Sequence, residues 1–272
     1  MTTIAPKLAE AAAPTAKPSR SGKAGQLACI HSFWGFFLLF LIGWVVLARF
    51  VPPISPHAPV EKLQHKYGAH QQTIEWGMVV CTFSMFFLGA WGGGVCSQLR
   101  RLDGRNGALV WAWIMCQGAL VSYFMFACIF WGVAAFRPGD VHQVQSFTDA
   151  GWFAFLVDVP TVILQCWIIG YLALKDRRPE PIFPRWFGYL QLLDGFGIVG
   201  ATFVYVFKTG PFAWTGIFGF WLVIIMGFQW MIVTTVMTAR AINRSADEPD
   251  VDDTGALESR IARLEAQLAK GR

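Results

Sequence analysis

Long apolar segments alternate with short polar ones along most of the chain. Six of the apolar segments are hydrophobic on most faces, and each reaches the roughly 20 residues that an α-helix needs to cross a bilayer. These segments cover roughly residues 28–49, 74–96, 108–134, 150–174, 186–207 and 212–239. The pattern predicts an all-α fold, in which residues 28–240 form an integral membrane bundle of six transmembrane helices.

The two ends of the chain lack such segments. Residues 1–27 are rich in Ala, Pro, Lys and Ser without apolar periodicity, which indicates a disordered cytoplasmic tail. Residues 241–254 form an acidic linker. Residues 255–270 predict a short coiled-coil helix that favours a homo-oligomer, with heptad positions at Leu257, Ile261, Leu264 and Leu268. The alternative is a solvated amphipathic helix that lies on the membrane or on the protein.

The basic residues divide unequally between the two sides of the predicted membrane. One side receives Lys7, Lys17, Arg20, Lys23, Arg100, Arg101, Arg105, Lys175, Arg177, Arg178, Arg185, Arg240 and Arg244, and the other receives Arg49, Lys62, Lys66, Arg137 and Lys208. Because short loops rich in Lys and Arg stay in the cytoplasm, the sequence predicts that both termini are cytoplasmic. Compactness and topology indicate a bacterial inner membrane. A signal peptide is the competing interpretation of the first segment, but LARFVPP lacks a small-x-small cleavage site.

The composition supports a membrane protein and excludes some other classes. Hydrophobic residues make up 55% of the chain and charged residues only 14%, whereas a soluble domain has about a quarter of its residues charged. The net charge is +5, but the basic residues follow the predicted loops, so no nucleic-acid partner is expected. The six cysteines lie in or beside apolar segments without metal-binding spacing, which is typical of small buried hydrophobes.

Two acids lie well inside the predicted spans. Asp158 is in the fourth, slightly to the outer side of its middle, and Asp194 is in the fifth. Charged groups at the centre of a transmembrane helix cost about 2.5–3.5 kcal/mol on insertion scales and are functional candidates by default. Helical spacing places each acid in a polar stripe that is completed by Thr161, Gln165 and Gln191. We expect these stripes to face the interior of the bundle, because lipid cannot satisfy them.

No Lys or Arg lies in the middle of any predicted span, so neither acid has a cationic partner inside the membrane. Each acid would therefore carry a proton, stay ionised in a wet cavity or bind a cationic ligand. The structural alternative is a protonated Asp that hydrogen-bonds between helices. Glu75 opens the second span at the outer interface and is a further candidate for a proton or ligand site, although water would also hydrate it there. Pro160 removes a backbone donor beside Asp158, so carbonyls near residue 156 are expected to lose a helical partner.

The longest outer loop carries a trio of metal-ligating residue types. His57, Glu61 and His65 are four residues apart and would share one face of a helix, where a metal could bind. Pro56 and Pro59 interrupt that helix, so the alternative is a solvated face. No catalytic motif for hydrolysis, phosphate binding or metal chemistry occurs, and we assign no catalytic residue and expect no cofactor.

The second predicted span also contains the segment LGAWGGG, residues 88–94. Its small residues form two overlapping small-xxx-small pairs, Gly89 with Gly93 and Ala90 with Gly94. Such pairs allow another helix to approach closely, and packing is the favoured interpretation.

Two stretches resemble a known group of proteins. The segments FPRWFGYL (183–190) and VFKTGPFAW (206–214) are similar to FPRW-x-GY and FKTGPFAW stretches in a family of uncharacterised six-helix, multi-pass membrane proteins of bacteria. The resemblance covers about a quarter of the chain and implies no activity. Both stretches also suit helix ends at a membrane surface, because their Trp, Tyr and Arg side chains anchor there.

Three functions fit these patterns. The first is a permease or transport component for a small hydrophobic or cationic solute, with the intramembrane acids as proton or ligand sites. The second is a non-catalytic membrane scaffold or accessory subunit that oligomerises or docks partners. The third is a metal-independent enzyme, of the isomerase or cyclase type, in which Asp158 and Asp194 exchange protons with a lipophilic substrate. The bilayer is a partner in all three.

Overall fold

The computed structural model describes residues 20–104 and 107–244 of the chain. Its elements in chain order are α1 (Arg20–Leu41), the π-helical segment η1 (Ile42–Leu47), α2 (Val60–Ala69), α3 (Gln71–Asp103), α4 (Ala108–Phe136), α5 (Val141–Leu156), α6 (Val159–Lys175), α7 (Arg185–Gly197), the 3₁₀ segment η2 (Ile198–Tyr205), the π-helical segment η3 (Ile217–Trp221) and α8 (Leu222–Arg244). No strand occurs among the described residues. The predicted all-α fold is confirmed.

Six segments within the described residues are long and apolar enough to cross a membrane. α3 and α4 each form one span, whereas the other four combine two elements: α1 with η1, α5 with α6, α7 with η2, and η3 with α8. The spans are Gly22–Leu47, Gln71–Asp103, Ala108–Phe136, Val141–Lys175, Arg185–Tyr205 and Ile217–Arg244. The number of spans agrees with the apolar pattern of the sequence.

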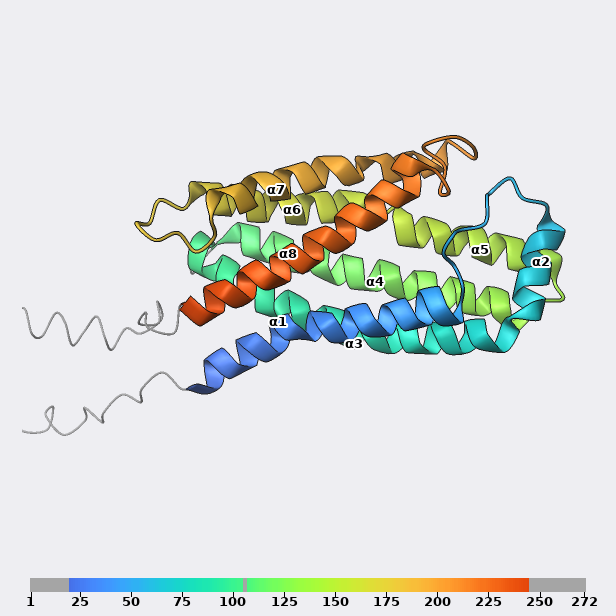
Figure 1. Ribbon diagram of the computed structural model, residues 1–272, viewed down its shortest axis with the longest axis horizontal. Coiled ribbons are helices and arrows are strands. Elements are labelled where there is room, and N and C mark those ends of the chain that lie inside the picture. The colour runs from blue at the N-terminus through green and yellow to red at the C-terminus, as the bar shows by residue number, and fades with distance from the viewer. Residues whose placement is uncertain (1–19, 105–106, 245–272) are drawn as a thin grey trace, which may run out of the picture.

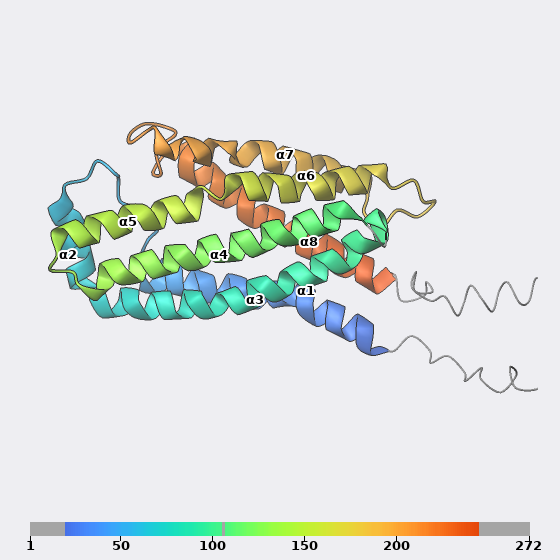
Figure 2. The ribbon, with the colours of Figure 1, turned by 180° about the vertical axis from the view of Figure 1, so that it is seen from behind.

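Successive spans run in alternating directions (Figures 1 and 2). The start of α1 and the end of α8 lie at one end of the bundle, together with the α3–α4 and α6–α7 connections. We call this the basic end, because most of the Lys and Arg side chains of the described residues lie there. The opposite end, which we call the α2 end, carries the short helix α2 and the α4–α5 and α7–α8 connections.

Most helices pack against their neighbours in the chain, and α8 ties the sequence-distant parts together. α3 contacts α1 and α4, α4 contacts α5, and α6 contacts α7. α8 crosses one face of the bundle diagonally (Figure 1) and contacts α1, α3, α7 and η2. The largest side chains that are fully buried between the helices are aromatic, and they include Trp44, Trp91, Trp113, Trp131 and Trp230.

Glycines allow the closest helix contacts, but not all of those in the LGAWGGG segment do so. A Cβ on Gly94 would lie 2.7 Å from the backbone nitrogen of Ile30, so α1 and α3 require glycine there. A Cβ on Gly43 would lie 2.6 Å from the carbonyl oxygen of Gly77, which joins η1 to α3 in the same way. Gly89 and Gly93 have nothing within 4 Å of such a Cβ. The predicted Gly89–Gly93 pair therefore packs against no other helix of the residues that the structure describes.

The fourth span differs from the continuous helix that the apolar pattern indicated. It begins at Val141 rather than near residue 150, because the carboxylate of Asp140 caps α5 by accepting a hydrogen bond from the backbone N–H of Gln143 (3.1 Å). The span is also interrupted between Leu156 and Val159. Pro160 lies in the first turn of α6, where its missing N–H is tolerated, so the chain restarts a helix there instead of continuing α5.

The predictions for the chain ends fall mostly outside the described residues. α1 already begins at Arg20, within the stretch 1–27 that the sequence assigns to a disordered tail. α8 continues to Arg244, so it includes the first residues of the segment 241–254. The rest of that acidic linker and the coiled-coil segment 255–270 lie outside the described residues.

Candidate functional site

Asp158 lies at the break in the fourth span. It occupies the residue before α6, near the midpoint of the span Val141–Lys175, and only 5% of its surface is exposed. The sequence placed it beyond the middle, towards the α2 end, but α5 lengthens the half of the span at that end. The hydroxyl of Thr161 donates to the Asp158 carboxylate oxygen Oδ1 and lies 2.9 Å from its backbone carbonyl. The other carboxylate oxygen, Oδ2, is buried and has no hydrogen-bond partner.

The second acid, Asp194, lies near the end of α7 and is 1% exposed. Neither of its carboxylate oxygens has a hydrogen-bond partner. Its polar neighbours are Gln229 of α8, which is not in hydrogen-bonding geometry, and the thiol of Cys166 of α6. Asp158 instead lies near the thiol of Cys116 of α4. The two acids have different neighbours and no hydrogen bond joins them.

Gln165 links the fourth span to two other helices. Its amide nitrogen Nε2 donates to the side-chain oxygen of Gln117 on α4 (2.9 Å). The amide of Gln117 in turn donates to the backbone carbonyl of Leu88 on α3 (2.9 Å). The side-chain oxygen Oε1 of Gln165 is buried without a partner. This chain of amides therefore holds α3, α4 and α6 together and still leaves one acceptor unused.

Gln191 belongs to a separate and fully bonded cluster. Its amide nitrogen donates to the hydroxyl of Thr234 (3.0 Å), and its side-chain oxygen accepts from the indole N–H of Trp230 (2.8 Å). The indole N–H of Trp91 on α3 donates to Thr235 (2.9 Å), and the rings of Trp91 and Trp230 meet edge to face. We call these residues the Gln191 cluster. It joins α7, α8 and α3, and each of these amide and indole groups has a partner.

The remaining sequence candidates lie at the α2 end and apart from the acids. Glu75, in the first turns of α3, accepts a hydrogen bond from the Gln71 amide (3.1 Å). α2 begins only at Val60, so His57 precedes it and cannot stack with Glu61 and His65 on one helical face. No three His, Cys, Asp or Glu side chains of the described residues lie close enough together to hold a metal. The trio would stack only on a helix that began before His57, and the structure has no helix at that position.

A different polar cluster occupies the α2 end. The Lys66 ammonium donates to the backbone carbonyl of Arg49 (2.8 Å) and lies 4.6 Å from the centre of the Phe50 ring. Burial lowers the pKa of Lys66 to about 8. Burial also raises the pKa of the Tyr67 phenol, whose hydroxyl has no hydrogen-bond partner. This cluster joins α2 to the chain between η1 and α2.

Sequence reasoning missed several of the residues that complete the buried polar clusters. Thr234 and Thr235 are adjacent in α8 and carried a partial signal, because two neighbouring hydroxyls interrupt an otherwise apolar segment. Trp91 carried none, since the sequence contains 13 Trp residues and nothing distinguishes this one. Gln117 lies alone among apolar residues of α4, and its bonds to α6 and α3 follow from the packing alone.

These features define the class of the protein: an integral membrane protein whose described residues contain six helical segments long and apolar enough to cross a membrane, with polar side chains inside the bundle. Comparisons with protein-family models, curated proteins and solved structures found no match for this chain. The resemblance of residues 183–190 and 206–214 to bacterial membrane proteins therefore stays a prediction.

Proposed function

We propose that the protein is a permease or transport component for a small hydrophobic or cationic solute, with Asp158 as its proton or ligand site. The observation that carries the proposal is the break in the fourth span, where Asp158 is buried with one carboxylate oxygen unpaired. In many transporters, the binding site lies near the middle of the membrane where a helix is interrupted. The interruption here occupies the same position within its span.

The chemistry of Asp158 supports this role. An ionised carboxylate in apolar surroundings is unfavourable unless it is paired, and no described residue forms an ion pair with Asp158. A proton or a cationic ligand removes that penalty. Because Asp158 lies at the junction of α5 and α6, a change in its charge acts on the junction itself. This couples occupancy of the site to the geometry of the fourth span.

A second interruption supports the same proposal. The fifth span changes from an α-helix to the 3₁₀ segment η2 at Ile198, one turn beyond Asp194. The contacts of η2 with α6 and α8 place it beside the break in the fourth span. We therefore propose Asp194 as a second proton site, at a neighbouring pair of interrupted spans.

The arrangement gives less support to the enzymatic alternative. Acid–base catalysis on one substrate requires both groups within hydrogen-bonding reach of the reacting atoms. Asp158 lies beside Cys116 of α4 and lines a cavity, whereas Asp194 lies beside Cys166 and Gln229 and does not line that cavity. That cavity therefore does not bring both acids to a single substrate, as the exchange of protons would require.

The orientation belongs to the same proposal. The basic end carries Lys23, Arg100, Arg101, Lys175, Arg177, Arg178, Arg185, Arg240 and Arg244, whereas the α2 end carries Arg49, Lys62, Lys66, Arg137 and Lys208. By the positive-inside rule the basic end faces the cytoplasm of a bacterial cell, with both termini inside. Single cysteines introduced at Glu180 and at Glu61 in a cysteine-free variant test this. We expect a membrane-impermeant maleimide to label only residue 61 in intact cells, and labelling of residue 180 alone would invert the orientation.

The function is tested with the purified full chain in liposomes loaded with a pH-sensitive dye. Tetraphenylphosphonium and indole serve as the cationic and hydrophobic probes, and proton movement on their addition is recorded. We expect Asp158→Asn to lower solute-dependent proton flux at least tenfold, and Glu180→Gln, which removes an exposed acid, to leave it unchanged. If Asp158→Asn were silent and removal of residues 255–272 instead abolished assembly with a partner, the scaffold alternative would replace this proposal.

A further inference from the structure

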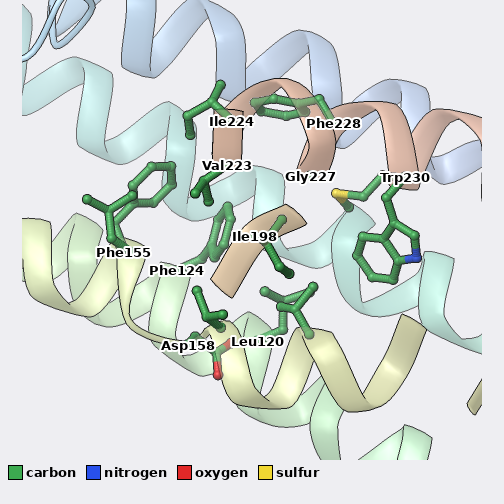
Figure 3. Close-up of a pocket in the computed structure, with 14 residues that line it drawn as sticks. Leu120, Phe124, Phe155, Asp158, Ile198, Val223, Ile224, Gly227, Phe228 and Trp230 are labelled. Atoms are coloured by element: carbon green, nitrogen blue, oxygen red, sulfur yellow. The ribbon is translucent and has the colours of Figure 1, made fainter. Parts of the chain in front are cut away.

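A cavity of about 80 Å³ lies beneath α8, beside the break in the fourth span (Figure 3). Its walls come from α4, from the residues on both sides of the break, from η2 and from α8. Apart from Asp158, the lining consists of aliphatic and aromatic side chains, one methionine and one glycine. The cavity is therefore the place where a solute would bind if the proposed function is correct. Its apolar lining restricts the kind of solute that can bind there.

The polar groups at the cavity wall do not face its interior. Asp158 lies at the edge opposite Ile224 and Phe228, and its carboxylate oxygen is turned away from them (Figure 3). One of its oxygens accepts from Thr161, and the carboxylate lies towards Cys116 of α4. The indole N–H of Trp230, the other polar group in the wall, donates to Gln191. A charged solute would therefore lose its hydration without gaining a partner.

The cavity is not sealed on the side of α8. Val223, Ile224, Gly227 and Phe228 line it but are only half-buried. At this depth the bundle is surrounded by hydrocarbon, because these residues lie within the sixth span. A Cβ on Gly227 would meet nothing within 4 Å, so the missing side chain leaves free space at the cavity wall. The cavity therefore opens towards the lipid beside Gly227.

We propose that this cavity binds an uncharged, apolar molecule or chain that enters sideways from the bilayer past Gly227. The inference rests on the proposed function and selects the hydrophobic solute over the cationic one. It also separates two roles: the cavity holds the apolar body, while Asp158, which lies behind the break, takes up the proton. A free small molecule and a lipid acyl chain share this chemistry, and the experiment distinguishes them.

The test measures quenching of tryptophan fluorescence by bromine in the full-length protein, since Trp230 lines the cavity. Bromobenzene is added to protein in detergent without phospholipid, and phospholipids with brominated chains are used in a separate nanodisc experiment. Gly227→Leu fills the cavity from α8. Gly89→Leu is the matched control, because Gly89 faces the exterior of α3 with nothing within 4 Å of a Cβ. Val223→Phe fills the cavity from a second position if Gly227→Leu does not fold.

We expect a saturable component of quenching in the wild type and in Gly89→Leu, and at least tenfold weaker binding in Gly227→Leu and Val223→Phe. Saturation by bromobenzene identifies a free small molecule, and a Gly227-dependent signal from brominated chains alone identifies a lipid chain. The inference is overturned if filling the cavity changes neither signal, or if tetraphenylphosphonium competes with bromobenzene for the cavity in a way that Asp158→Asn abolishes.

The experiments can contradict the proposed binding cavity and the proposed transport function independently of each other. Saturable binding in a protein without solute-dependent proton flux would leave the cavity assignment intact and remove the proposed function. Conversely, flux that depends on Asp158 but is unchanged in Gly227→Leu and Val223→Phe would keep the proposed function and overturn the cavity as its binding site.

Discussion

The Gln191 cluster and the Asp158 junction are both buried, polar and built from neighbouring helices, yet they are satisfied to different degrees. The side-chain amide of Gln191 and the indoles of Trp230 and Trp91 all have hydrogen-bond partners. At the junction, Asp158 keeps one carboxylate oxygen without a partner and interrupts its helix. A satisfied network fixes the position of helices, whereas an unsatisfied group retains the capacity to bind something. The difference separates a structural element from a candidate site.

The largest change in stability is expected from the satisfied cluster. Gln191→Leu removes the acceptor of Trp230 and the donor to Thr234, so two buried polar groups lose their partner. We expect a loss of about 2 kcal/mol in the free energy of unfolding, since each unsatisfied buried group costs roughly 1–3 kcal/mol and membrane interiors reduce the effect. Unfolding by SDS in mixed micelles measures it, and an unchanged transition would show that the cluster does not hold α7 to α8.

A smaller loss is expected at Gln165, which is only partly bonded. Gln165→Leu removes one hydrogen bond to Gln117 and also removes a side-chain oxygen that has no partner. These effects oppose each other, so we expect a loss of about 0.5–1 kcal/mol in the same unfolding assay. A loss as large as that of Gln191→Leu would mean that the amide chain is as important for the fold as the Gln191 cluster.

Asp158→Asn is expected to leave stability within about 0.5 kcal/mol of the wild type. The substitution keeps an acceptor for Thr161, whose hydroxyl also lies 2.9 Å from the Asp158 carbonyl. It replaces the unpaired carboxylate oxygen with an unpaired amide nitrogen, so the number of unsatisfied polar atoms does not change. Thermal denaturation followed by size-exclusion chromatography provides the measurement. A strong destabilisation would place Asp158 with the structural residues and weaken the contrast between the two clusters.

The smallest effect near neutral pH concerns Lys66 at the α2 end. Burial lowers the pKa of Lys66 from 10.5 to about 8 in the folded protein, so from about pH 7 upwards, and most strongly between pH 8 and pH 10.5, the unfolded chain binds more protons than the folded one. Stability therefore rises with pH, by about 0.3 kcal/mol between pH 7 and pH 8. Lys66→Met should remove this rise, and a stability that instead fell with pH in the wild type but not in the variant would contradict the assignment.

The sequence predicted the frame of the molecule because length and apolarity determine it. A helix needs about 20 apolar residues to cross the hydrocarbon core of a bilayer, and six segments of the chain meet this requirement. The inward position of Asp158, Gln165, Gln191 and Asp194 also followed from helical spacing, and all four are buried. These features depend on residues that are close together in the chain.

Features that depend on residues far apart in the chain could not be predicted from helical spacing. Trp91 and Thr235 are 144 positions apart and meet only because α8 crosses over α3. The cavity beneath α8 depends on the same diagonal crossing and on the free space beside Gly227. The earlier start of α5 depends on a cap at Asp140 outside the apolar segment. Pro160 predicted the loss of a backbone hydrogen bond near residue 156, but not the complete break between α5 and α6.

The central claim is that Asp158 serves transport while the Gln191 cluster serves the fold. The most direct test compares Asp158→Asn with Gln191→Leu in one liposome preparation, with proton flux on addition of the solute probes expressed per folded protein and unfolding measured alongside. We predict that Asp158→Asn lowers this flux at least tenfold with unchanged stability, whereas Gln191→Leu lowers stability but keeps the flux of the folded fraction. Equal flux in Asp158→Asn and the wild type would contradict the account.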